Sequence, residues 1–177
     1  MENIDYDSLK LTLKGIVLKV FYDEIEKHGL KNIYGFALCS DLSKMSIAVN
    51  TYKHFEDSIK NNSGNYLDYK YDVEKWYERV NNNDIENYNK TLHSYCYNRR
   101  QPVEQAIQHL EKLNKLSIEV LNELKNEKVF NELNNDFILL ITSNYGTTPE
   151  IFIRYNNKNN TDEYEKWMFD INDMSKS

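Results

Sequence analysis

The stretch over residues 33–55 constrains the fold most, because it carries two strand patterns and the start of a helix. Residues 33–39 and 45–49 each read as a short apolar strand, and the polar segment between them is typical of a turn. A connection this short joins antiparallel strands, so we expect a β-hairpin. Apolar residues then take up helical spacing after residues 50–51, either of which suits a helix N-cap.

The two faces of the first strand differ in size. Alternation places Tyr34, Phe36 and Leu38 on one face and Ile33, Gly35, Ala37 and Cys39 on the other. Small residues let a helix approach closely, so we expect the helix predicted over residues 5–28 to pack on the hairpin through its apolar stripe. Asp5, Asp7 or Ser8 suits the N-cap of this helix, and Gly29 suits its C-terminal end.

Further segments complete the predicted fold. Helices are predicted to start near residues 84, 102 and 161–162, strands over 66–71, 137–142 and 150–155, and a helical turn over 72–79. Trp76 in that turn is expected to be buried and structural. We find no linker or internal repeat, and therefore expect one domain over residues 1–177. The expected fold class is α+β, with a mainly antiparallel sheet of about four to five strands covered by several α-helices.

Charge and composition exclude several classes of function. The net charge of −6 disfavours binding to nucleic acid or to an anionic membrane. No apolar run approaches the roughly 20 residues of a membrane span, and we see no signal peptide, so we expect a cytoplasmic protein. The two cysteines, Cys39 and Cys96, form no C-x-x-C pair, which fits a reducing compartment.

We find no catalytic or cofactor motif. The chain lacks G-x-x-x-x-G-K, G-x-G-x-x-G and H-E-x-x-H. Its four histidines, His28, His54, His93 and His109, are scattered without a histidine pair at i, i+4, so we expect no metal site and no cofactor. Cys39 lies in the middle of a strand, where a buried thiol is expected rather than a nucleophile.

Three segments recur in an order that is similar to a known family. They are YGFALCSD, IAVNTYKHFED and YKYDVEKWYE, and the likeness is carried by Phe36, Ala37, Leu38, Asp41, Asn50, Thr51, Phe55, Lys70, Tyr71, Glu74 and Trp76. The chain thereby resembles a bacterial family catalogued as a domain of unknown function, DUF4303. The resemblance spans nearly the whole chain, departs from the family in the Asn- and Tyr-rich middle, and brings no catalytic residues with it.

Members of that family resemble, in genome setting and small acidic character, the immunity proteins that accompany secreted toxins. The resemblance therefore implies a non-enzymatic protein-binding domain that neutralises a bacterial toxin. We expect a basic toxin as the partner, since carboxylates would steer it and aromatic side chains would anchor it. The candidate partner-binding residues are Asp162, Glu163, Trp167 and Asp170.

Two other classes of protein stay open. One is an enzyme or small-ligand-binding protein whose site is assembled from scattered polar residues, with Asp41, Lys70, Glu74 and Arg154 as candidates. The other is a purely structural subunit. An enzyme should show a concave pocket with converging polar groups, whereas a binder should show an open acidic face.

Overall fold

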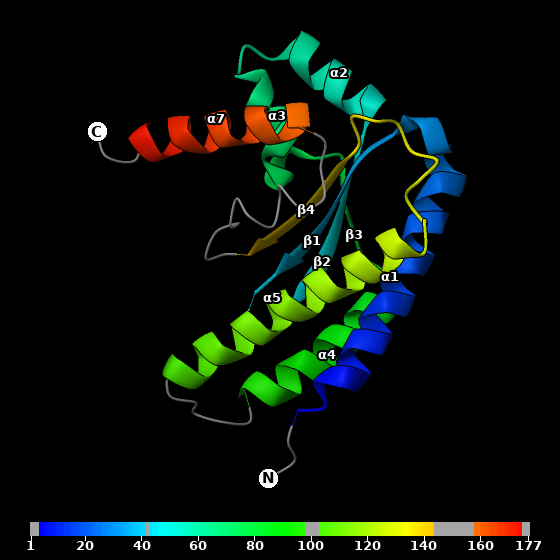
Figure 1. Ribbon diagram of the computed structural model, residues 1–177, viewed down its shortest axis with the longest axis vertical. Coiled ribbons are helices and arrows are strands. Elements are labelled where there is room, and N and C mark those ends of the chain that lie inside the picture. Colours follow the sequence, from blue (N-terminus) through cyan, green and yellow to red (C-terminus); the bar gives the residue numbers. More distant parts are fainter. Residues whose placement is uncertain (1–3, 42, 98–102, 144–157, 175–177) are drawn as a thin grey trace.

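A mixed sheet of four strands lies between two layers of helices in the computed structural model, which describes residues 4–41, 43–97, 103–143 and 158–174 (Figure 1). Within these ranges, side chains are described except at residues 95–97, 103, 143, 158–159 and 170–174. The strands are β1 (Ile33–Ser40), β2 (Met45–Thr51), β3 (Glu78–Val80) and β4 (Ile138–Ser143). The longer helices are α1 (Tyr6–His28), α2 (Tyr52–Asn61), α3 (Tyr66–Tyr71), α4 (Asn83–Tyr97), α5 (Val103–Asn126) and α7 (Lys158–Met174).

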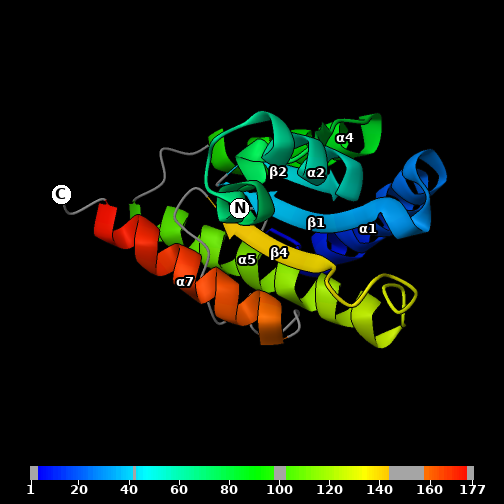
Figure 2. The ribbon, with the colours of Figure 1, turned by 90° about the horizontal axis from the view of Figure 1, so that it is seen from above.

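The predicted β-hairpin is confirmed, and it forms the centre of the sheet. β1 pairs antiparallel with β2, so that Phe36 lies opposite Val49 and Leu38 opposite Ile47. β3 continues antiparallel on the outside of β2, but β4 runs parallel to β1, and the two arrows point the same way in Figure 2. The α+β class is therefore confirmed, and the sheet is mixed rather than purely antiparallel. The helical connection through α4 and α5 lets β4 start at the same end of the sheet as β1.

The helix ends follow local capping chemistry. Asp5 caps α1, because its carboxylate accepts a hydrogen bond from the amide of Ser8 at 3.0 Å. Gly29 ends α1 with a φ of +82°, a backbone conformation that glycine adopts without steric cost. Thr51 caps α2 by accepting from the amide of His54 at 3.2 Å. The sequence predicted Gly29 at the end of α1, and it offered Asp5 and Thr51 each as one of two or three possible N-caps.

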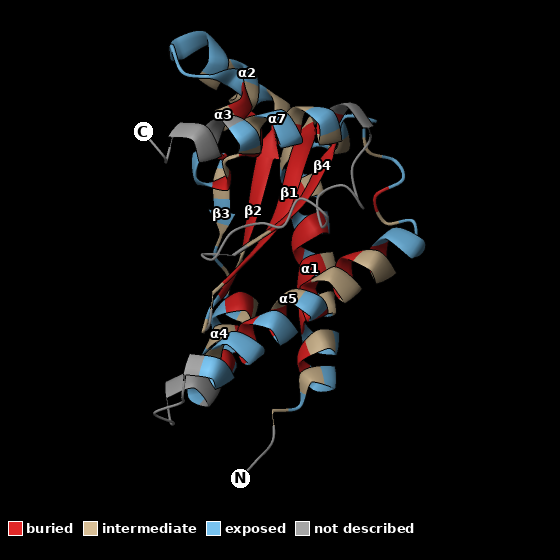
Figure 3. Ribbon diagram, turned by 60° about the vertical axis from the view of Figure 1, so that its left-hand side comes forward, coloured by how far each residue is buried: buried red, intermediate tan, exposed pale blue. Residues whose placement is uncertain are grey.

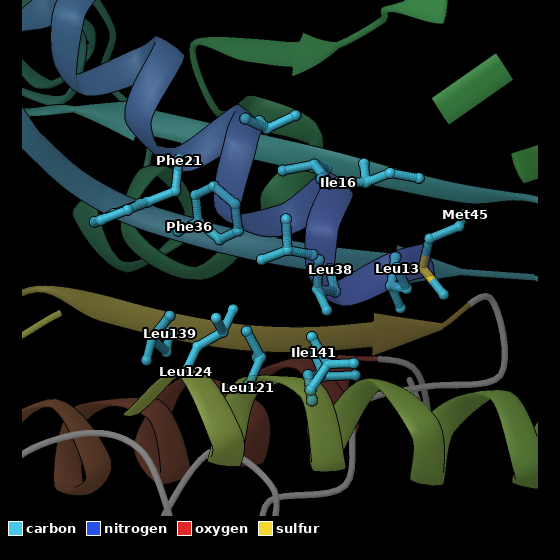
Figure 4. Packing of buried hydrophobic residues seen from close by; sticks show 14 of the residues in the cluster. Leu13, Ile16, Phe21, Phe36, Leu38, Met45, Leu121, Leu124, Leu139 and Ile141 are labelled. Carbon is cyan, nitrogen blue, oxygen red and sulfur yellow. The ribbon is translucent and has the colours of Figure 1, made fainter. Parts of the chain in front are cut away.

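The larger hydrophobic core lies between the sheet and the layer formed by α1, α4 and α5. The α1 residues Leu13, Ile16 and Phe21 meet strand residues from β1, β2 and β4, and Leu121 and Leu124 reach the same core from α5 (Figure 4). The predicted apolar stripe of α1 is thus buried on the sheet. The stripe packs on the face of Phe36 and Leu38. The sequence had led us to expect it on the other face, which carries the small residues.

The second core lies on the opposite face, under α2, α3 and α7. A β-bulge at Ile33–Gly35 explains its composition, because the bulge turns Tyr34 to the same face as Gly35 and breaks the predicted alternation. An indole ring, and not a helix, packs on the small residues of this face, because the Trp76 ring covers Gly35. Trp76 is 7% exposed, and its Nε1 donates to the carbonyl of Lys70 at 3.2 Å, which confirms that it is buried.

Four predicted elements differ from the structure or lie outside the described residues. Residues 66–71 form helix α3 rather than a strand, because Asn65 accepts from the amide of Leu67 and starts a helix there. The predicted turn over 72–79 contains the short 3₁₀ helix η2 (Val73–Lys75) and the first two residues of β3. The strand predicted over 150–155 lies outside the described residues, whereas α7 begins a few residues before its predicted cap.

The contact between Gly35 and Trp76 predicts that a methyl group added at Gly35 lowers the stability of the fold. A Cβ at Gly35 would lie 2.8 Å from the Trp76 ring, so we expect Gly35→Ala to lower the free energy of unfolding by about 1–3 kcal/mol. Gly15→Ala is the matched control. Its Cβ would meet no atom within 4 Å, and within a helix it should raise stability by about 0.5–1 kcal/mol. Urea unfolding of both variants measures the two changes, and equal stability of Gly35→Ala and the parent would contradict the contact.

Candidate functional site

A polar cluster holds α7 against α3. The Lys70 ammonium is paired with the Glu163 carboxylate, and the Tyr71 and Tyr66 hydroxyls each donate to Glu163 at 3.2 Å. Nearby, the Trp167 indole donates to Asp68 at 2.9 Å. Partial burial opposes ionisation of Glu163, but the hydrogen bond and charge of Lys70, together with the hydrogen bonds of Tyr71 and Tyr66, outweigh it and lower the pKa of this carboxyl. Glu163 and Trp167 therefore have structural partners within the chain.

The outer face of α7 carries acids together with one exposed phenylalanine. Asp162, Glu165, Lys166 and Phe169 are exposed, and their spacing of three and four residues places them on one side of the helix. Phe169 is 66% exposed, which is unusual for so large an apolar side chain. We call these four residues the α7 outer face. The side chain of Asp170, another predicted candidate, lies outside the described part of the molecule.

A small polar cavity opens at the carboxyl ends of β1 and β4. It has a volume of about 240 Å³ and is lined by Cys39, Ser40, Asp41, Lys44, Ser46, Glu74, Arg79 and Thr142. Parallel strands end at the same edge of a sheet, and ligands of open α/β sheets commonly bind there. The Arg79 guanidinium is paired with Glu74 and donates to the Ser46 hydroxyl at 3.2 Å.

The Cys39 thiol lines this cavity from the end of β1. The residue is only 8% exposed, and burial raises the pKa of its thiol to about 11, although the charge of Arg79 acts in the opposite direction. The thiolate is the reactive form, so a thiol with so high a pKa is inert near neutral pH. The predicted role of Cys39 as a buried thiol fits this environment. The cavity offers hydroxyls, carboxylates and two cationic side chains, and is suited to binding a small polar molecule.

A third cluster joins the end of α1 to β3. Glu24 and His28 lie one helical turn apart, and their Oε2 and Nε2 atoms face each other at 3.3 Å. Glu78 of β3 completes the group, and the ligand atoms of all three residues lie within 4.8 Å of one another. Lys27 is paired with Glu78 and lies 3.8 Å from Glu24. Burial raises the pKa of Glu24, while the charge of Lys27 opposes that shift.

The structure brings together some of the predicted polar residues and separates others. Asp41 and Glu74 line the same cavity, whereas Lys70 lies with Glu163 in the α3–α7 cluster. Arg154 lies outside the described residues. Sequence reasoning missed Arg79 and Lys44, and it also missed Glu24 and His28, because the search for ligand pairs considered histidines alone. A search for carboxylate–histidine pairs at i, i+4 would have found the latter two.

The described structure thus defines an α+β protein with a mixed sheet, a helix face that carries two acids, a lysine and an exposed phenylalanine, and a small polar cavity at the sheet edge. A family model described as a domain of unknown function, DUF4303, matches residues 13–161. The chain belongs to this family, as the three sequence segments indicated. No curated protein and no solved structure matches the chain. Among the described helices, none has the length and apolar character needed to cross a membrane.

The α3–α7 cluster predicts a pH-dependent contribution of Glu163 to stability. We expect Glu163→Gln to lower the free energy of unfolding by about 1 kcal/mol at pH 7, a modest value because 36% of the side chain is exposed. A carboxyl whose pKa is lowered by folding adds stability above its unfolded pKa and loses it as the pH falls through the folded value. The difference between parent and variant should therefore shrink below about pH 5.

Chemical denaturation at several pH values measures this difference. The exposed neighbour Asp162 provides the control, since Asp162→Asn should change stability by less than about 0.5 kcal/mol. A Glu163→Gln penalty that stays constant from pH 7 to pH 3 would contradict the assignment.

Proposed function

We propose that this protein is a non-enzymatic, cytoplasmic protein-binding domain of immunity type, which neutralises a bacterial toxin by covering a basic surface of it. The observation that carries the proposal is the α7 outer face. It combines exposed carboxylates at Asp162 and Glu165 with an exposed aromatic ring at Phe169. Such a combination suits a basic partner, because the acids attract it over a distance and the ring supplies apolar contact area.

The contacts under α7 support this use of the helix. Trp167 bonds to Asp68 and Glu163 pairs with Lys70, so one side of the helix is fixed to α3. Tyr164, which is 1% exposed, anchors the same side in the second core. A helix held in this way presents its outer residues at fixed positions, which reduces the conformational entropy lost on binding. Of the predicted partner-binding residues, Asp162 is then a contact residue, while Glu163 and Trp167 position the helix.

Charge reversal on the α7 outer face tests this proposal. We expect Asp162→Lys combined with Glu165→Lys to slow association with the partner toxin, which is to be sought among the products of neighbouring genes, by about 10-fold or more at low salt. The effect should shrink as salt rises, because the Debye length falls from about 30 Å at 0.01 M to about 8 Å at 0.15 M. Phe169→Ala should instead speed dissociation and leave the association rate nearly unchanged. Surface plasmon resonance measures both rates.

A matched control variant distinguishes the effect of a local contact on the association rate from the effect of net charge. Glu104→Lys combined with Glu111→Lys changes the net charge by the same amount on α5, which packs on the other face of the sheet. This control should slow association less than the α7 variant does. Equal slowing by both pairs, or no complex with any toxin identified in this way, would contradict a docking role for α7.

The polar cavity favours a second candidate function, the binding of a small anionic ligand. Lys44 and Arg79 both line the cavity and supply positive charge, while Ser46 and Thr142 supply hydroxyls. Arginine is well suited to gripping a carboxylate or phosphate through paired N–H groups. Here the Arg79 guanidinium is paired with the Glu74 carboxylate, so an incoming anion would have to displace that carboxylate.

Ligand-dependent thermal stability tests the second candidate. Inorganic phosphate and succinate at millimolar concentration should raise the melting temperature of the parent, since a ligand that binds only the folded state stabilises it. Arg79→Gln should abolish the shift and Glu74→Gln should enlarge it, whereas Lys53→Gln on α2, outside the cavity lining, should leave it unchanged. Equal shifts in Arg79→Gln and the parent would exclude this cavity as the binding site.

A further inference from the structure

We propose that Glu24, His28 and Glu78 form a binding site for a divalent transition-metal ion of the zinc type. Two of the ligands come from consecutive turns at the end of α1, and the third comes from the edge strand β3. The site is separate from the polar cavity and from the α7 outer face, and it revises the expectation from sequence that the chain holds no metal.

The burial of Glu24 is the first observation that points to a cation. The residue is 6% exposed, and among the described residues neither its Oε2 nor the Nε2 of His28 makes a hydrogen bond. Burying a carboxylate oxygen and an imidazole nitrogen without hydrogen bonds costs free energy, and chains retain such groups mainly where something compensates them. A metal ion would satisfy both atoms at once.

The distance between the two atoms is the second observation. Glu24 Oε2 and His28 Nε2 lie 3.3 Å apart. Two ligands bound at about 2.0–2.1 Å to one tetrahedral zinc ion are separated by roughly 3.3–3.4 Å, so this pair already has the required spacing. Glu78 needs only a small side-chain movement, because its carboxylate is within 4.8 Å of both and the side chain is one-third exposed.

The position of Lys27 is the third observation. Its ammonium is paired with Glu78 and lies 3.8 Å from Glu24, so a cationic group already neutralises part of the cluster. The Lys27 side chain is 45% exposed and flexible, and it can turn outward into water when a metal ion takes its place. The ammonium and the metal would therefore compete for the same two carboxylates.

The ligand set selects the class of metal. Imidazole nitrogen suits zinc, copper, nickel and iron, whereas calcium and magnesium prefer oxygen ligands alone. Three protein ligands leave a fourth position for water, as in zinc sites that keep an open coordination position. Bound metal would also tie the last turn of α1 to β3, a strand of three residues at the edge of the sheet.

Isothermal titration with Zn²⁺ tests the site in the whole chain. The parent should bind one Zn²⁺, and His28→Gln and Glu78→Gln should each weaken binding by at least the 10- to 100-fold seen when metal sites lose a supporting group. Lys27→Gln should bind Zn²⁺ about 10-fold more tightly, because the competing positive charge is gone. Co²⁺ bound in place of Zn²⁺ should show the visible absorption of a four-coordinate site.

The controls exclude non-specific binding and misfolding. His93→Gln removes an exposed histidine on α4 and should leave Zn²⁺ affinity unchanged, and Ca²⁺ should not compete. Circular dichroism checks that each variant is folded, and Lys27→Gln and Glu78→Gln change side chains that are partly exposed. Zn²⁺ binding that His28→Gln and Glu78→Gln leave intact would overturn the proposal, as would a failure of both the parent and Lys27→Gln to bind.

Discussion

Burial of β1 on all sides is the constraint on which the rest of the structure depends. Each of its eight residues is buried, as the red central strand in Figure 3 shows. β2 and β4 pair with its two edges, and a helical layer covers each of its faces. Its peptide groups gain partners from the neighbouring strands, while its side chains reach two separate cores. β3 extends the sheet from β2, and the longer helices form the two layers that cover its faces.

Much of the fold could be predicted because the local signals were strong. The hairpin, the stripe of α1 and the caps at Asp5 and Thr51 rest on short-range patterns, and the structure confirms them. One error came from an overlooked local signal: Asn65 caps a helix over residues 66–71, where a strand was predicted. The direction of β4 depends on tertiary interactions, since no pattern in residues 137–142 could show that this strand would run parallel to β1. The bulge at Ile33–Gly35 is a similar case, because it depends on how the strand pairs.

The candidate sites were harder to predict than the fold, since each joins residues from distant segments. Asp41 and Glu74 line one cavity, but Arg79 reaches it only because β3 adds to the hairpin. Lys70 was a candidate for a polar site, yet its ammonium pairs with Glu163 and holds α7 against α3. Glu24 and His28 are close in sequence, but Glu78 joins them only across the end of the sheet. Residue type alone could not distinguish a charged side chain that pairs within the fold from one that is available to bind a ligand.

The parallel pairing of β1 with β4 has a consequence for how the chain is made. Gly35 pairs with Ile138, so one edge of β1 has no partner until β4 is made, about 100 residues further along the chain. At the usual rate of about 5–20 residues per second, the ribosome needs several seconds to synthesise that partner. During this time the nascent hairpin has an open, strongly apolar strand edge, which can pair with another chain. Newly made copies of this protein are therefore at risk of aggregation until β4 emerges, and a chaperone that shields β1 would act in that interval.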